Sequence, residues 1–186
     1  MRLTLFFIIG LALTGCASVG GSGISGNAIE VTGVDDELAD EIEVSSLGFS
    51  RPFMGVVTVG TADPFFRAYI GKEQMRLESM QLYVIASSAD WMYWDEVRFR
   101  MGDSLVKIPM SRIGTDVQCG QYGCAHFEDI VGSVFVEHLE YISSQEAPVT
   151  LRLNSSRVGG YLDMQISPKE AQTFLSELRN TTDQGD

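Results

Sequence analysis

The segment Val97–Ile108, with the sequence VRFRMGDSLVKI, decides how the rest of the chain is interpreted. Apolar residues such as Phe99 alternate with arginines, and an apolar side chain at every second position is typical of a β-strand with one buried face. Gly102 and Asp103 separate the two alternating runs and favour a two-residue turn with glycine at its first position. The segment therefore predicts a β-hairpin.

The other face of this hairpin carries Arg98 and Arg100. Their guanidinium groups could bind a phosphate or carboxylate ligand. Asp95 and Glu96 lie beside them in the sequence and can pair with them locally. A solvated sheet face with local ion pairs is therefore the favoured interpretation.

The same alternation recurs along the chain and is clearest in Leu77–Ala86, where Met80, Leu82, Val84 and Ala86 share one face. The run 127–141 is apolar on both faces, which predicts a central strand or two strands broken near Gly132. The other predicted strands are one near a sheet edge at 54–60, closed by a turn at Asp63-Pro64, and a second hairpin formed by 149–153 and 161–166.

The last apolar segment has the period of a helix. Ser167 is a good N-cap, Pro168 suits the first helical position, and Glu170 would complete a capping box. The apolar stripe of this helix consists of Ala171, Phe174, Leu175 and Leu178. These patterns predict a mostly β, antiparallel β-sandwich-like domain over 53–180 with the C-terminal α-helix packed on it, and a polar tail at 181–186.

The chain opens with a short apolar segment, Leu3–Cys16. This segment is too short to span a bilayer and lies where a secretory signal peptide would lie. Its last four residues, Leu13-Thr14-Gly15-Cys16, resemble the lipobox of bacterial lipoprotein precursors. An ordinary signal peptide in which Cys16 is incidental, or a retained N-terminal anchor helix, are the alternatives.

The lipobox resemblance implies that residues 1–15 are removed as a signal peptide. It also implies a diacylglycerol thioether on the sulfur of Cys16 and an acyl chain on its amino group, which together anchor a protein stably. Ala17 and Ser18 follow the cysteine where an aspartate would favour retention at the inner membrane. The resemblance thus implies an outer-membrane lipoprotein that faces the periplasm.

A Gly/Ser-rich stretch at 17–28 reads as a tether, and an acidic segment follows at 30–43. This acidic segment could form a short amphipathic helix or an extended chain, and a solvated entry segment is favoured over a cation or basic-partner site because no calcium-loop pattern is present. The lipidated cysteine, the tether and the acidic segment are together assigned to 16–52, so folded structure is expected to begin near Phe53.

The chain has 186 residues and a net charge of −12. Loss of residues 1–15 would remove Arg2 and leave 12 basic against 25 acidic residues, a net charge of −13. Such a chain repels nucleic acid and anionic head groups, so no nucleic-acid partner is expected. The expected partners are the membrane, through the acyl chains of Cys16, and another protein of the cell envelope.

With Cys16 assigned to lipid, Cys119 and Cys124 remain as an even pair in an oxidising compartment, which predicts a disulfide. The alternative is a metal-binding or redox protein in which Cys119, Cys124 and His126 bind a metal, with His138 or an acid as the fourth ligand. A Cys124–His126 nucleophile–base pair is disfavoured because Cys119 can oxidise Cys124.

The sequence contains no nucleotide-binding loop, serine-hydrolase elbow or zinc-protease motif. The aromatic run Trp91–Trp94 could stack on a ligand, but packing in the core is favoured. The sequence therefore favours a non-catalytic, protein-binding or structural envelope domain without a cofactor.

Overall fold

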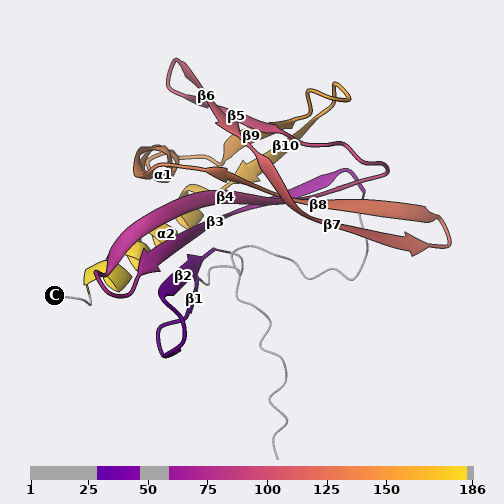
Figure 1. Cartoon of the computed structure of the whole chain (residues 1–186). Coiled ribbons are helices and arrows are strands. Elements are labelled where there is room, and N and C mark those ends of the chain that lie inside the picture. The colour runs from indigo at the N-terminus through magenta and orange to yellow at the C-terminus, as the bar shows by residue number, and fades with distance from the viewer. Residues whose placement is uncertain (1–28, 47–58, 184–186) are drawn as a thin grey trace, which may run out of the picture.

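The computed structural model describes residues 29–46 and 59–183 (Figure 1). The lipobox, the 17–28 tether, most of the predicted 54–60 strand and the end of the polar tail lie outside the described residues. The strands are β1 (Glu30–Thr32), β2 (Glu41–Ser45), β3 (Thr61–Gly71), β4 (Arg76–Ser88), β5 (Glu96–Met101), β6 (Ser104–Pro109), β7 (Ser111–Gly120), β8 (Gly123–Ser133), β9 (Val149–Asn154) and β10 (Tyr161–Ile166). The helices are α1 (Val136–Ser143) and α2 (Pro168–Thr182).

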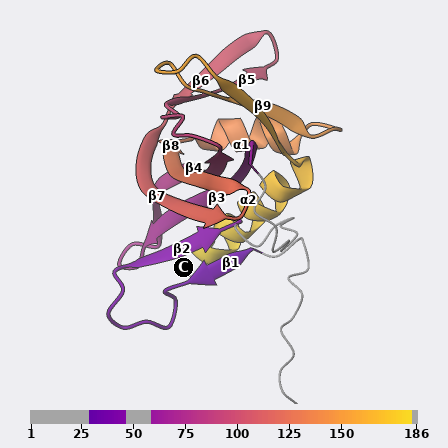
Figure 2. The same ribbon diagram turned by 90° about the vertical axis from the view of Figure 1, so that its right-hand side faces the viewer.

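These elements form two antiparallel sheets and two helices, so the predicted mostly β fold with a C-terminal helix is confirmed. The larger sheet has six strands in the order β1-β2-β3-β4-β8-β7, and the smaller has four in the order β10-β9-β5-β6. Contacts of β10 with β3 and of β6 with β8 bring the sheets together. The two helices contact each other, and α2 also contacts β2 and β3 (Figure 2). No helix among the described residues is long and apolar enough to cross a membrane.

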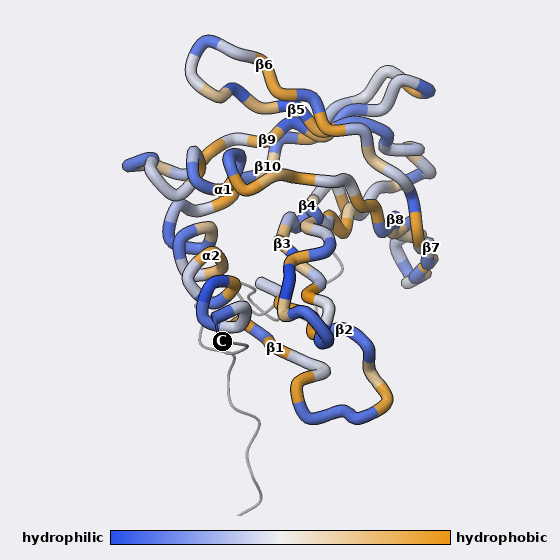
Figure 3. The backbone as a smooth tube through the Cα atoms, turned by 60° about the vertical axis from the view of Figure 1, so that its left-hand side comes forward, coloured by the Kyte–Doolittle hydropathy of each residue, from blue (hydrophilic) through white to orange (hydrophobic). Residues whose placement is uncertain are grey.

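One hydrophobic core joins both sheets and α2. Phe66 of β3 packs against Phe174 of α2 with ring centroids 5.7 Å apart. The predicted inward face of β4, formed by Met80, Leu82, Val84 and Ala86, is buried in this core. Apolar and hydrophilic stretches alternate along the strands in Figure 3, as expected when each strand has one buried face.

The β5–β6 hairpin has the predicted register, with Met101 opposite Ser104 and Val97 opposite Ile108. Gly102 adopts a φ of +61°, the left-handed conformation that this turn requires at its first position. Phe99 is 4% exposed, whereas Arg98 on the other face is exposed. The Val97 face is therefore the core face, as predicted.

The expected start of folded structure near Phe53 is wrong. Val31 of β1 pairs with Val44 of β2, and β2 in turn pairs with β3. Ile42 and Val44 are 3% and 0% exposed and alternate with acids, so the acidic segment ends in a strand with one buried face. The extended alternative, rather than the helix, describes this segment.

The turn predicted at Asp63-Pro64 is also wrong, because Pro64 lies within β3 opposite Val84. Phe66 directs its backbone carbonyl and N–H towards Ser46, away from β4. Alternate residues of a strand point the same way, so the missing N–H of Pro64 also faces away from β4. Proline is tolerated here because the β3–β4 ladder needs no donor at this position.

The run 127–141 forms β8 and then the helix α1, so a strand prediction for its second half is wrong. Leu139 and Ile142 are buried three residues apart, which is helical spacing. The Nδ1 atom of His138 accepts the N–H of Phe135 at 3.3 Å and so satisfies a donor at the start of the helix.

The predicted N-cap and first-turn proline of helix α2 are confirmed, with the Ser167 hydroxyl accepting the N–H of Glu170 at 3.0 Å and Pro168 opening the helix. The Glu170 carboxylate is buried and accepts a hydrogen bond of 2.7 Å from the Ser46 hydroxyl. This bond joins the C-terminal helix to the end of β2. The predicted apolar stripe of the helix is buried.

Candidate functional site

Strands β7 and β8 form a long hairpin, Ser111–Ser133, which we call the hairpin arm. Strand β8 pairs with β4 only from His126 to Ser133, so the tip formed by 119–125 extends past the neighbouring strand (Figure 1). No strand was expected at 111–118, because this sequence lacks an alternating apolar face. The structure shows why: nearly every side chain of β7 is exposed. Three exposed apolar side chains of the arm are Ile113, Val117 and Tyr122.

A disulfide between Cys119 and Cys124 closes the tip, with the two residues directly opposite each other and their Cα atoms 4.0 Å apart. In this state neither sulfur is a free thiol, so Cys124 cannot act as the nucleophile of a pair with His126. The described ranges 29–46 and 59–183 contain no group of three or more His, Cys, Asp or Glu side chains placed to hold a metal. The His126 ring instead lies edge-on against Trp91, with centroids 4.7 Å apart.

Glu128 is the most buried charged residue of the arm, at 1% exposure. Its carboxylate accepts hydrogen bonds from the backbone N–H groups of Met92 at 2.9 Å and Tyr93 at 3.1 Å. Arg112 Nη1 lies 3.3 Å from the same carboxylate. Buried side-chain oxygens need hydrogen-bond donors, and the donors of Glu128 come from the 91–94 loop and from Arg112, so Glu128 fixes this loop to the arm.

Sequence analysis missed Glu128, although a signal was present. It lies two residues from Ile130, which is 0% exposed and belongs to the core face of β8. An acid on the buried face of a strand needs hydrogen-bond or charge partners. The even spacing of Glu128 from Ile130, which puts both on the same face, therefore marks Glu128 as a structural or functional position.

Tyr93 is held in an uncommon backbone conformation, with a φ of +57°. A bulky residue in the left-handed region costs of the order of 1–2 kcal/mol, which the hydrogen bonds to Glu128 offset. The guanidinium carbons of Arg112 and Arg157 lie 5.1 Å and 3.8 Å from the centroid of the tyrosine ring. The conformation thus presents a half-buried ring flanked by two cations.

The aromatic run divides between core and surface. Trp94 is 5% exposed and belongs to the core, as favoured from the sequence, whereas Trp91 and Tyr93 are half-buried. We call the set Trp91, Tyr93, Arg112, His126 and Arg157 the aromatic–arginine surface. It draws on the 91–94 loop, both strands of the arm and the β9–β10 turn.

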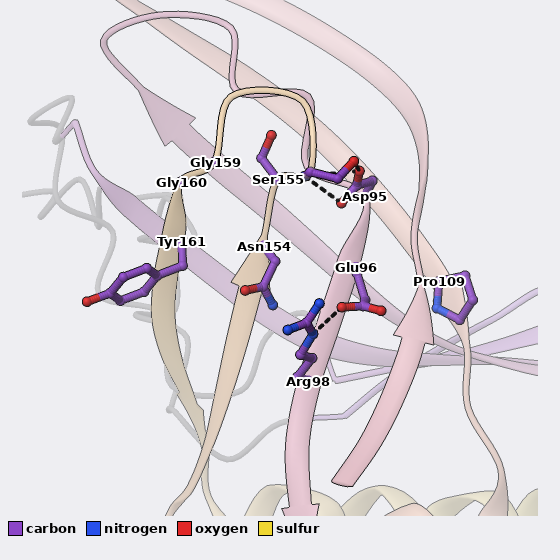
Figure 4. Close-up of a pocket in the computed structure, with 10 residues that line it drawn as sticks. Asp95, Glu96, Arg98, Pro109, Asn154, Ser155, Gly159, Gly160 and Tyr161 are labelled. Carbon is purple, nitrogen blue, oxygen red and sulfur yellow. Dashed lines mark hydrogen bonds and ion pairs between the residues drawn. The ribbon is translucent and has the colours of Figure 1, made fainter.

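A pocket of about 440 Å³ lies at one end of the smaller sheet, between Asp95 and the β9–β10 turn (Figure 4). Asp95 accepts hydrogen bonds from the backbone and hydroxyl of Ser156, and Glu96 pairs with Arg98. The Ser155 hydroxyl donates to the Met92 carbonyl. These polar groups bond to one another, and no histidine lines the pocket, so it offers no serine–histidine nucleophile among the described residues.

The exposed face of the smaller sheet carries a cross-strand row of charged residues. Arg152 lies opposite Asp163 on one side and Arg98 on the other, and Arg98 lies opposite Lys107. Arg152 binds Asp163 through two hydrogen bonds of 2.7 and 2.8 Å. Arg98 lies between two cations in this row, and its own ion pair is with Glu96, as the local-pair interpretation predicts.

No family model matches the sequence, and no curated protein or solved structure is detectably similar to it. Any functional conclusion therefore depends on the chemistry of this chain alone.

Proposed function

We propose that this protein is a lipid-anchored lipoprotein of the outer membrane, facing the periplasm, and that its β domain binds another envelope protein without catalysis. The proposal has two independent parts, an anchor and a binding surface. The lipobox residues Leu13–Cys16 support the anchor. The aromatic–arginine surface supports protein binding.

The observation that carries the binding proposal is the strained placement of Tyr93 between Arg112 and Arg157. Tryptophan, tyrosine and arginine are the residues most enriched at energetic hot spots of protein interfaces. Rigid aromatic side chains also lose little conformational entropy on binding. The buried Glu128 holds both the loop and Arg112 in place, so the surface is organised before a partner arrives.

Three kinds of titratable residue lie in or beside the aromatic–arginine surface: a glutamate, two cysteines and a histidine. Glu128 is enclosed by donors, and the Cys119 and Cys124 sulfurs are joined to each other. The His126 ring packs edge-on against Trp91, and its buried Nδ1 atom makes no hydrogen bond with the described residues. A recognition role uses the shape and polarity of these groups rather than proton transfer.

Site-specific photocrosslinking in intact cells tests the binding proposal. A benzophenone amino acid at Trp91 should give a discrete crosslinked species, because this residue lies on the surface and makes no hydrogen bond with its own side chain. The matched control is the same probe at Leu105, which is 51% exposed on the other sheet. Tyr93→Ala should abolish the Trp91 crosslink. Equal crosslinking from Leu105, or a crosslink insensitive to Tyr93→Ala, would contradict the proposal.

The anchor is tested separately. Cys16→Ser should give an uncleaved or mislocalised species, whereas Cys119→Ser should still be lipidated and fractionate with the outer membrane. A Cys16→Ser protein of mature size in the outer-membrane fraction would refute the lipoprotein assignment but leave the crosslinking result unaffected.

A further inference from the structure

The described strands leave four sheet edges, and they differ in how well they are protected. Strand β1 has three residues, β10 contacts β3, and β6 carries Lys107 and Pro109. Short length, lysine and proline are the usual devices that prevent a sheet edge from pairing with another chain. Strand β7 is ten residues long, is exposed along its length and contains neither lysine nor proline. Its charged residues are Arg112 and Asp116, and its pairing with β8 shifts register between Arg112 and Gly114, at the end far from the tip. It is the longest edge of the described sheets, and its register is regular over 114–120.

The hydrogen-bonding phase of β7 follows from the tip. Opposite residues about 4.5 Å apart at Cα form the non-hydrogen-bonded pairs of an antiparallel ladder, and Cys119 and Cys124 are 4.0 Å apart. The backbone N–H and C=O of Cys119 therefore point away from β8. Because this direction repeats every second residue, Val117 and Thr115 also direct their backbone groups to the free edge. The Val117 N–H donates there to Oδ1 of Asp116 in its own strand at 2.8 Å, a bond that pairing with a second strand would replace.

The sequence of this edge is compatible with itself. In an antiparallel pair of two β7 strands centred on Val117, valine meets valine, and Thr115 of one copy meets Cys119 of the other. Asp116 meets Gln118, a carboxylate opposite an amide donor, and these two side chains already bond within one chain at 3.3 Å. The register centred on Asp116 instead places two carboxylates opposite each other and is disfavoured.

We infer that the protein self-associates through β7, with a second copy of this chain as the occupant of the free edge. The two copies pair antiparallel about Val117 and join their six-stranded sheets across a two-fold axis. The pairing needs residues 114–120, which lie beyond the irregularity between Arg112 and Gly114. The match of the Asp116 acceptor with the Gln118 amide donor occurs twice across the two-fold axis, and this favours a copy of this chain over an unrelated strand. The inference does not depend on what binds the aromatic–arginine surface.

Sedimentation of the purified full-length chain in detergent tests this inference. The wild type should sediment as a dimer. Val117→Pro should sediment as a monomer with an unchanged far-UV circular dichroism spectrum, because the N–H that it removes faces the free edge, where its bond within the protomer is to the exposed Asp116 side chain, and the β8 ladder stays intact. Val117→Ala, which keeps that N–H, should remain dimeric. A monomeric wild type, or a dimeric Val117→Pro, would overturn the inference.

A charge test fixes the register independently. Gln118→Asp should weaken the dimer by roughly tenfold at low salt, because it places like charges opposite each other twice across the axis. Gln118→Lys, which places an opposite charge there, should bind at least as tightly as wild type. Equal dimer affinities for the two variants would exclude this pairing, even if another self-association exists.

Discussion

Arg112 Nη1 lies 3.3 Å from Oε1 of Glu128, although the arginine side chain is 39% exposed and the glutamate side chain only 1%. The pair thus connects the surface of the hairpin arm to a carboxylate inside it. The geometry explains how the core accommodates a carboxyl group, because the arginine and the N–H groups of Met92 and Tyr93 bond to its oxygens.

Glu128→Gln should lower the free energy of unfolding by on the order of 2–3 kcal/mol, because the amide nitrogen turns a donor towards backbone N–H groups that need an acceptor. Urea unfolding measures the change. The control is Glu140→Gln, which breaks an exposed pair with Arg179 and should cost less than about 0.5 kcal/mol. Similar losses in the two variants would mean that Glu128 is solvated.

Phe99→Ala should cost about 3–5 kcal/mol, because it empties a core position that is 4% exposed. Arg98→Ala on the opposite face should cost less than about 1 kcal/mol, the worth of its exposed pair with Glu96. Urea melts of both variants compare the two faces of β5, and equal costs would contradict the assignment of its core face.

The Cys119→Ser/Cys124→Ser variant should fold with a free energy of unfolding lower by roughly 2 kcal/mol, the closure entropy of so short a loop. Because residues 119–125 extend past β4, amide exchange should accelerate at the tip and not in β3 or β4. Thiol titration of the denatured, unreduced wild type should find neither Cys119 nor Cys124 free. Two free thiols with bound zinc would instead support the metal site.

His138 should make stability sensitive to mild acid. Burial lowers its pKa from the usual 6.5, and the charge of Glu137 opposes this effect more weakly. The folded state therefore favours the neutral ring, which accepts the Phe135 N–H. The resulting stabilisation is complete above the unfolded pKa and is lost as the pH falls through the lower, folded pKa.

Unfolding free energies of wild type and His138→Asn at pH 7.5 and pH 5 isolate this contribution from the carboxylates, which titrate in both proteins. The difference between the two proteins should shrink at the lower pH. A difference independent of pH would show that the imidazole does not titrate in this range.

The elements that could be predicted from the sequence are those decided by residues close together in the chain. The β5–β6 hairpin follows from alternation and Gly102, and the start of α2 follows from Ser167 and Pro168, because each is decided by neighbouring residues. Strand β2 was overlooked because its acids obscured the alternation of Ile42 and Val44.

Features decided by distant residues were not predictable. Helix α1 resembles a strand until Leu139 and Ile142 are seen to share one buried face. The conformation of Tyr93 depends on Glu128, which lies 35 residues away in the chain. The disulfide could be predicted from the number of cysteines and the expected compartment. The aromatic–arginine surface could not, because it forms only when the 91–94 loop packs against the hairpin arm.

Because the fold begins as early as β1, only a short segment separates it from Cys16, and this limits the distance between the domain and the membrane. If Cys16 carries lipid, 13 residue steps separate it from Ile29, and even a fully extended chain of this length spans at most about 43–47 Å. The first strand then stays within that radius of the membrane surface. Copies whose first strands are confined to this layer meet far more often than they would in free solution.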